Sequence, residues 1–224
     1  IEHFDRIIRP GDSSSRPEEE IEFSTPLNLI EPILFADKGE LFPKEVVRTR
    51  LGITSDSLVV YVQLGAGKIN DIESDLDRII RILNVHNNLQ IVVGESLIGK
   101  RLNVVGERIR TIRDYPNSLS FNGFDFAIMA GGYNSYHEAI EFALPTIFLP
   151  NTETGMDDQV ARVKAGAEAG ACIMITDQND ESIQNAVTKM INLEERMKFV
   201  ESCTKLSKLN GANEAATIVL DYIG

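Results

Sequence analysis

Two glycines followed by a glutamate are the residues of this chain best suited to chemistry by type and spacing. Gly131 and Gly132 end an apolar run, Phe126–Met129, and Glu138 follows in the next segment. A glycine turn between a strand and a helix leaves the first N–H groups of the helix without internal partners, and the helix dipole makes that end positive. Such an end binds phosphate. A carboxylate one turn into the helix can accept hydrogen bonds from a sugar diol, so the pattern predicts a nucleotide site.

A purely structural interpretation of the same residues stays open. The helix is expected to open at Asn134 or Ser135, and Ser135 and Glu138 have the S-x-x-E spacing of a capping box. In a capping box, Glu138 would turn back to the backbone at the helix start and touch no ligand. The glycine pair and the proline-bounded apolar run at residues 146–149 favour the ligand interpretation, although the spacing alone fits both.

A second glycine turn follows the apolar run at residues 58–64. Gly65, Ala66 and Gly67 precede a predicted helix, and glycines at such a turn let the backbone approach a phosphate closely. The turn is an incomplete dinucleotide fingerprint, because Asn70 stands where G-x-G-x-x-G requires its third glycine. The alternative is a plain strand-to-helix turn.

A polar loop, residues 151–159, leads from the end of the strand at 146–149 into another helix. In a parallel sheet, this is the edge at which ligands bind. Asp158 and Gln159 offer a carboxylate and an amide at the helix start, which suit sugar hydroxyls. The structural alternative is that Asp157 caps the helix.

Composition indicates a globular protein: 43% of the residues are hydrophobic and 25% are charged. The net charge of −12 argues against nucleic acid as a partner. No apolar run has the length of a membrane helix. No metal site is predicted, because Asp75 and Asp77 form a D-x-D on a helix, where positions two apart point in different directions. The isolated Cys172 and Cys203 suggest reduced thiols and a cytoplasmic protein.

Apolar runs alternate with helical patterns from residue 58 onwards, which predicts an α/β fold with a doubly wound, Rossmann-like parallel sheet. A short strand is expected at 4–8, followed by a polar linker at 10–20. Further strands are expected at 58–64, 89–93, 108–113, 126–129, 146–149 and 172–175. Helices are expected at 43–51, 71–84, after Gly132, and at 157–169, 180–209 and 212–223.

Residues 131–150, together with Asp158 and Gln159, resemble the nucleotide-sugar-binding C-terminal half of GT-B glycosyltransferases. The enzymes related to the MurG N-acetylglucosaminyltransferase are the most similar in these motifs. This resemblance extends from about residue 32 to the C-terminus. It implies that residues 1–31 are the end of a missing N-terminal domain with its linker, and that residues 32–224 form the nucleotide-sugar-binding domain.

The resemblance also implies roles for individual residues. A pyrophosphate would lie against Gly65, Ala66 and Gly67 and against the helix start that follows Gly131 and Gly132, at Asn134 and Ser135. Glu138 would bind the ribose, and the backbone near Tyr115 would contact the base, which is uracil in most of the family. Asp158 and Gln159 would face the donor sugar. Where relatives often carry Asn one turn beyond that Gln, this chain has Arg162.

The expected function is therefore donor binding by an inverting glycosyltransferase that uses a UDP-sugar as substrate, with neither a metal nor another cofactor. The acceptor site and the general base would belong to the missing N-terminal acceptor domain or to a separate acceptor-binding subunit. Any contact with the membrane would also come from that half. Two alternatives remain: a UDP-sugar epimerase of the same fold, for which Asp158 and Glu153 are the candidate acid–base groups, and a non-catalytic nucleotide-binding subunit.

Overall fold

The computed structural model describes residues 4–13, 25–65, 72–97, 101–102, 104–152, 157–177 and 179–223. Its centre is a sheet of six strands, each parallel to its neighbours. The predicted α/β class with a parallel sheet is confirmed. The strands are β3 (Leu58–Gln63), β4 (Leu89–Gly94), β5 (Ile109–Ile112), β6 (Phe126–Met129), β7 (Thr146–Phe148) and β8 (Cys172–Met174).

The strand order of this sheet is β5-β4-β3-β6-β7-β8. The chain builds outward from β3 to one edge, then returns to the middle and builds outward from β6 to the other edge. This is the order of doubly wound dinucleotide-binding folds, whose ligands sit where the order reverses. Here β3 and β6 are the adjacent strands at that point, with Gln63 opposite Met129. The ends of these two strands therefore lie side by side at the reversal.

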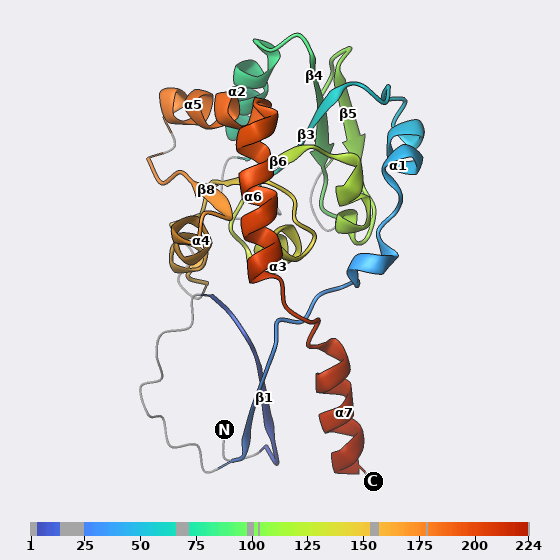
Figure 1. The fold of residues 1–224 in the computed structure, drawn as a ribbon, viewed down its shortest axis with the longest axis vertical. Coiled ribbons are helices and arrows are strands. Elements are labelled where there is room, and N and C mark those ends of the chain that lie inside the picture. The colour runs from blue at the N-terminus through green and yellow to red at the C-terminus, as the bar shows by residue number, and fades with distance from the viewer. Residues whose placement is uncertain are drawn as a thin grey trace.

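Helices cover both faces of the sheet (Figure 1). Alternate strand residues face opposite cores, so that Val59 and Tyr61 point to one side while Val60 and Val62 point to the other. All four are fully buried, as expected for a parallel sheet covered on both sides. The helices are α1 (Lys44–Arg50), α2 (Ile72–Asn84), α3 (Tyr133–Glu141), α4 (Gln159–Glu168), α5 (Asp180–Ile191) and α6 (Leu193–Leu206), with short 3₁₀ helices η1 (Lys38–Glu40) and η2 (Asn117–Gly123).

A smaller part of the chain lies apart from the main sheet, at the lower end of Figure 1. It consists of a two-stranded parallel sheet, β1 (Ile7–Pro10) and β2 (Leu27–Ile30), and of α7 (Ala212–Ile223). The guanidinium of Arg6 lies 5.6 Å from the ring centre of Tyr222, so α7 packs beside β1. No residue of α7 is buried, and its apolar Leu220 and Ile223 are exposed. Among the described residues, no helix is both long and apolar enough to cross a bilayer.

Two crossing segments join this smaller part to the main body, and they are tied to each other. The side chain of Asn210 accepts a hydrogen bond from the backbone N–H of Leu34 at 3.0 Å and donates one to the Leu34 carbonyl. The N–H of Gly211 donates to the Pro32 carbonyl at 2.9 Å. A side chain at position 211 would collide with the backbone of Glu31, because a Cβ there would lie 2.0 Å from the Glu31 carbonyl oxygen. The predicted helix break at Asn210 and Gly211 is confirmed.

Three expectations about elements need correction. The single helix expected at 180–209 is two helices, because Asn192 adopts an extended backbone and caps α6 by accepting a hydrogen bond from the Glu195 N–H. The first strand lies at Ile7–Pro10 rather than at 4–8, and β2 was not expected. Residues 14–20 of the predicted linker are outside the described residues. Cys172 and Cys203 are free and buried.

Candidate functional site

Gly65 and the glycine pair Gly131 and Gly132 follow the ends of β3 and β6, the adjacent strands at the sheet reversal. The N–H of Ala130 donates to the Gln63 carbonyl at 3.1 Å, which fixes the two strand ends together. Gly65 has φ +104°, a conformation that favours glycine. A Cβ built on Gly65 or Gly132 would meet no described atom within 4 Å. Within the part of the chain that the structure describes, Gly65 and Gly132 therefore border open space. Ala66 and Gly67 are outside the described residues.

The amino end of α3 has the features of an anion seat. The helix begins at Tyr133, and its N-cap is Gly132, which has no side chain to satisfy the end of the helix. The first intrahelical hydrogen bond runs from the N–H of Tyr136 to the Gly132 carbonyl at 2.9 Å. Asn134 is exposed and Ser135 is half-buried in the first turn. The free N–H groups of this turn point toward the strand ends, and the positive end of the helix dipole lies at the same place.

Glu138 does not form a capping box. Ser135 is inside α3 rather than at its N-cap, so the geometry of that motif is absent. Instead, the hydroxyl of Ser118, in η2, donates a hydrogen bond to Glu138 Oε1 at 2.9 Å. The carboxyl is buried, and this burial raises the pKa of Glu138 to about 7, against the opposing effect of the Ser118 hydrogen bond. Glu138 is thus a buried acid that bonds to Ser118 rather than to its own helix start, and its pKa lies near neutral pH.

The turn before α3 packs directly on α4. A Cβ on Gly131 would stand 2.6 Å from Val163 Cγ2, and Val163 is fully buried. Only glycine at position 131 allows the two helices this approach. The two glycines thus have different roles. Gly131 lets the turn pack against Val163 of α4, while Gly132 leaves the space beside the amino end of α3 open.

The polar loop before α4 is internally bonded. Asp158 is the N-cap of α4 and accepts a hydrogen bond from the N–H of Ala161 at 2.9 Å, so the cap lies one residue later than the alternative at Asp157. Gln159 is buried; its amide oxygen accepts from the N–H of Asn151 at 3.0 Å, and its amide nitrogen donates to Asp157 at 3.1 Å. These bonds join the end of β7 to the start of α4.

Arg162 is the charged centre of this region. Its guanidinium donates to both carboxylate oxygens of Asp12, at 2.8 and 2.7 Å, to Asp157 at 2.6 Å, and to the Gly131 carbonyl at 2.8 Å. The residue is only 3% exposed. The arginine at this position therefore fastens the segment after β1 to the glycine turn and to the loop before α4.

Tyr133 makes a second connection between the smaller part and α3. Its hydroxyl donates a hydrogen bond to the Gly11 carbonyl at 3.0 Å and accepts one from the N–H of Ile33 at 3.3 Å. The ring also lies under the guanidinium of Arg162, 5.6 Å from the ring centre. The first residue of α3 thus bonds to the segments that leave β1 and β2.

Tyr115 lies in the loop between β5 and η2 and is 67% exposed. Its ring packs edge-on against Phe35, with ring centres 5.1 Å apart. The following segment, η2, carries Ser118, so the loop assigned to the nucleobase and the partner of Glu138 are close in sequence.

The sequence did not predict that two residues, Ser118 and Asp12, belong to this site. Ser118 contacts Glu138 from twenty positions away, and Asp12 reaches Arg162 across 150 positions. No local spacing links such pairs, because they meet only when the strands assemble. Arg162 was noted as a departure from the family, but its partners could not be foreseen.

No protein-family model and no curated protein matches the sequence. Solved structures with similar folds include the spinosyn forosaminyltransferase SpnP, with a TM-score of 0.66 at 14% identity over 97% of this chain and 55% of that one. The calicheamicin glycosyltransferase CalG4 gives 0.61 at 17% identity, over 90% and 48% of the two chains. The spinosyn rhamnosyltransferase SpnG complexed with thymidine diphosphate gives 0.58 at 16% identity, over 84% and 49%.

The chain spans about half the length of these three structures. At sequence identities this low, the structural similarity establishes the fold alone. The six-stranded parallel sheet and the helices on both of its faces agree with that comparison. The chain therefore has the Rossmann-like α/β fold found in GT-B glycosyltransferases.

Proposed function

We propose that this chain is the donor-binding half of an inverting glycosyltransferase that moves a sugar from a UDP-sugar to an acceptor hydroxyl. One observation carries the proposal. The uncapped amino end of α3 stands at the sheet reversal, and the buried Glu138 lies one turn behind it. The fold shared with glycosyltransferases, one of them complexed with thymidine diphosphate, supports a nucleotide-sugar donor. The MurG-like motifs support UDP in particular.

The proposed roles follow the chemistry of each group. The diphosphate lies over Gly65, Ala66, Gly67 and the first turn of α3, where Asn134 and Ser135 supply backbone N–H groups. Glu138 accepts hydrogen bonds from the ribose hydroxyls, and the loop at Tyr115 contacts the base. Asp158 and Gln159 border the donor sugar, and their own hydrogen bonds fix the loop that carries them.

Catalysis by this half consists of stabilising the leaving group. As the acceptor oxygen attacks the anomeric carbon and inverts it, negative charge grows on the departing UDP. Backbone N–H groups and the dipole of α3 already point at that charge, so they stabilise the transition state without reorganising. In this proposal the helix end replaces a divalent metal. The general base and the acceptor site belong to an N-terminal acceptor domain or a separate subunit.

The test is calorimetric titration with UDP, dTDP, GDP, ADP and NAD. We expect UDP to bind best. We expect Glu138→Ala to weaken UDP binding by about 1–3 kcal/mol, because a buried charged hydrogen bond is lost. Glu168→Ala is the matched control, since Glu168 is exposed on α4 and its loss should leave affinity unchanged. A Glu138→Ala protein that melts earlier but binds UDP normally would overturn the assigned role.

The epimerase alternative is tested by product analysis. An epimerase converts the UDP-sugar to its epimer without an acceptor. A transferase paired with its acceptor-binding half releases UDP only as a glycosylated acceptor forms. Epimer formation with no acceptor present would replace the proposal with that alternative.

A further inference from the structure

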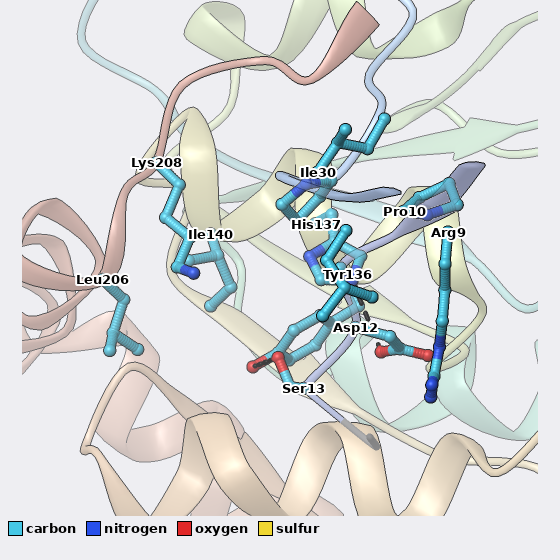
Figure 2. A pocket seen from close by; sticks show the side chains of 13 residues that line it. Arg9, Pro10, Asp12, Ser13, Ile30, Tyr136, His137, Ile140, Leu206 and Lys208 are labelled. Atoms are coloured by element: carbon cyan, nitrogen blue, oxygen red, sulfur yellow. Dashed lines mark hydrogen bonds and ion pairs between the residues drawn. The ribbon is translucent and has the colours of Figure 1, made fainter. Parts of the chain in front are cut away.

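A cavity of about 440 Å³ lies behind α3, between this helix, the two strands of the smaller sheet and the end of α6 (Figure 2). Its size is within the range of small-molecule sites, roughly 300–1,000 Å³. Glu138, Gly65, Gly131 and Gly132 are not among its described lining residues. The cavity is therefore separate from the proposed nucleotide site.

The walls of the cavity are largely apolar. Leu29, Ile30 and Pro10 come from the small sheet, while Ile140 and Leu206 come from α3 and the end of α6. Leu29 is 57% exposed, although it lines the hollow. An apolar ligand body would remove such surface from water, at roughly 25 cal/mol for each Å² buried.

The polar groups of the cavity are mainly basic. Arg9, His137 and Lys208 are its basic side chains, and Figure 2 shows Arg9 and Lys208 on opposite sides of the hollow. Asp12 is the one acidic side chain among the described lining residues, and it accepts a bidentate bond from Arg162, which also pairs with Asp157. Lys208 also pairs with Glu31 at 2.9 Å. A basic lining within a chain of net charge −12 is a local feature that attracts anions.

His137 supplies the second indication of a ligand. Its side chain is 9% exposed, and its Nε2 atom is buried with no hydrogen-bond partner among the described residues. Asp12 Oδ1 lies 3.5 Å from this nitrogen. Buried polar atoms of native proteins normally have a partner, so an unsatisfied one lining a cavity points to a group that is bound there.

We propose that this cavity binds a small anionic amphiphile, a molecule with an apolar body and one anionic head group. The head group lies between His137 Nε2 and the cations at the rim, and the body packs against Ile140, Leu206 and Leu29. This site does not depend on the proposed nucleotide site.

Calorimetry with three octyl compounds tests the charge preference. Octanoate, 1-octanol and octylammonium share one apolar body and differ in their head group. We expect octanoate to bind best, and 1-octanol to bind at least about tenfold more weakly because it lacks the charge-assisted hydrogen bonds. Octylammonium should not bind. Equal affinity for all three, or preference for octylammonium, would overturn the proposal. Octyl phosphate then shows whether the head group is better matched by phosphate than by carboxylate.

Variants locate the binding. Lys208→Gln and His137→Phe should each weaken octanoate binding several-fold, while Lys205→Gln, which neutralises an exposed lysine of α6, should not. Leu29→Trp should abolish binding by filling the cavity, whereas Val85→Trp places the same side chain at an exposed position elsewhere. Octanoate binding that survives both Lys208→Gln and Leu29→Trp would place the ligand elsewhere and refute the site.

Competition with UDP separates this proposal from the previous one. Octanoate should bind equally well in saturating UDP. If UDP displaces octanoate, the cavity is part of the nucleotide site and the inference is wrong, even if the proposed function is right. If UDP does not bind at all, octanoate binding still supports the cavity.

Discussion

Glu138 is a buried acid whose pKa of about 7 makes the proposed ribose contact depend on pH. A diol donates two hydrogen bonds to a carboxylate, so UDP binding favours the ionised form and should strengthen as the pH rises from about 5.5 to about 8. Calorimetry across this range measures the effect. UDP itself titrates near about pH 6, as phosphates do. Glu138→Gln is therefore the control, because it keeps only the contribution of the nucleotide.

The same acid should affect stability in the opposite direction. Its pKa is higher in the folded chain than in the unfolded chain, where a glutamate titrates near about 4.3. Between these two values the folded state binds more protons, so the contribution of Glu138 to the unfolding free energy falls as the pH rises from about 4.3 to about 7. Urea unfolding of the wild type and of Glu138→Gln should diverge across this window. Parallel pH profiles would show that Glu138 titrates normally.

Arg162 is the residue whose loss should cost the most stability. Arg162→Met leaves the carboxylates of Asp12 and Asp157 without their buried cation, and breaking a buried pair costs about 3–5 kcal/mol. Lys164→Met on the same helix is the control, since Lys164 is exposed and such changes stay within about 0.5 kcal/mol. The measurement is the urea midpoint with its slope. Equal midpoints for the two variants would contradict the role given to Arg162.

At the residue scale, the sequence predicted groups that act through local geometry. The glycine turn and the helix start after it followed from spacing alone, within one or two residues. The raised pKa of Glu138 could not be predicted from spacing, because it depends on burial in the assembled core and on the hydrogen bond from Ser118. The capping-box spacing was present, yet the helix begins three residues too early for Ser135 to cap it, because the N-cap is Gly132.

At the scale of the element, the two glycines before α3 should respond differently to the same substitution. Gly131→Ala forces a Cβ against Val163, and overpacking of this kind costs about 1–3 kcal/mol. Gly132→Ala meets open space, so the fold should be unaffected. However, its methyl group enters the space over the helix end, and UDP affinity should fall. Thermal melting and calorimetry on both variants separate the two effects.

The boundary between α5 and α6 gives a second test at this scale. Asn192 accepts a hydrogen bond from the Glu195 N–H at 3.2 Å, and removing such a cap costs about 1 kcal/mol. Asn192→Ala should therefore lower the unfolding free energy, while Asn192→Asp should keep most of it. Identical stabilities would mean that the cap is not what divides these helices. The sequence predicted one helix here, because the apolar pattern runs through Asn192 without a glycine or proline.

At the scale of the whole molecule, the chain spans about half the length of the glycosyltransferases whose fold it shares. Under the proposed function, residues 1–224 alone should bind UDP weakly and transfer no sugar, since the acceptor site is elsewhere. A radiolabelled UDP-sugar with a panel of hydroxyl acceptors provides the assay. Turnover by this chain alone would contradict the division into halves.

The sequence leaves few possible strand orders for the main sheet, but it does not predict the arrangement of the smaller part formed by β1, β2 and α7. Alternating apolar runs and helices with right-handed crossovers leave few arrangements for residues 58–175. In contrast, β2 is only four residues long, and α7 lies beside β1 rather than on the main sheet. Contacts of that kind depend on the crossing segments, whose side-chain bonds leave no periodic pattern in the sequence.

The hydroxyl of Tyr133 has a further consequence for the molecule. It donates a hydrogen bond to the Gly11 carbonyl and accepts one from the Ile33 N–H, and these residues follow β1 and β2 at the same end of the small sheet. Any swing of β1 and β2 must break these two bonds or turn the first residue of α3 with them. Under the proposed function, phosphate binding at α3 and the tilt of β1 and β2 are therefore coupled through the Tyr133 hydroxyl, together with the Arg162–Asp12 pair.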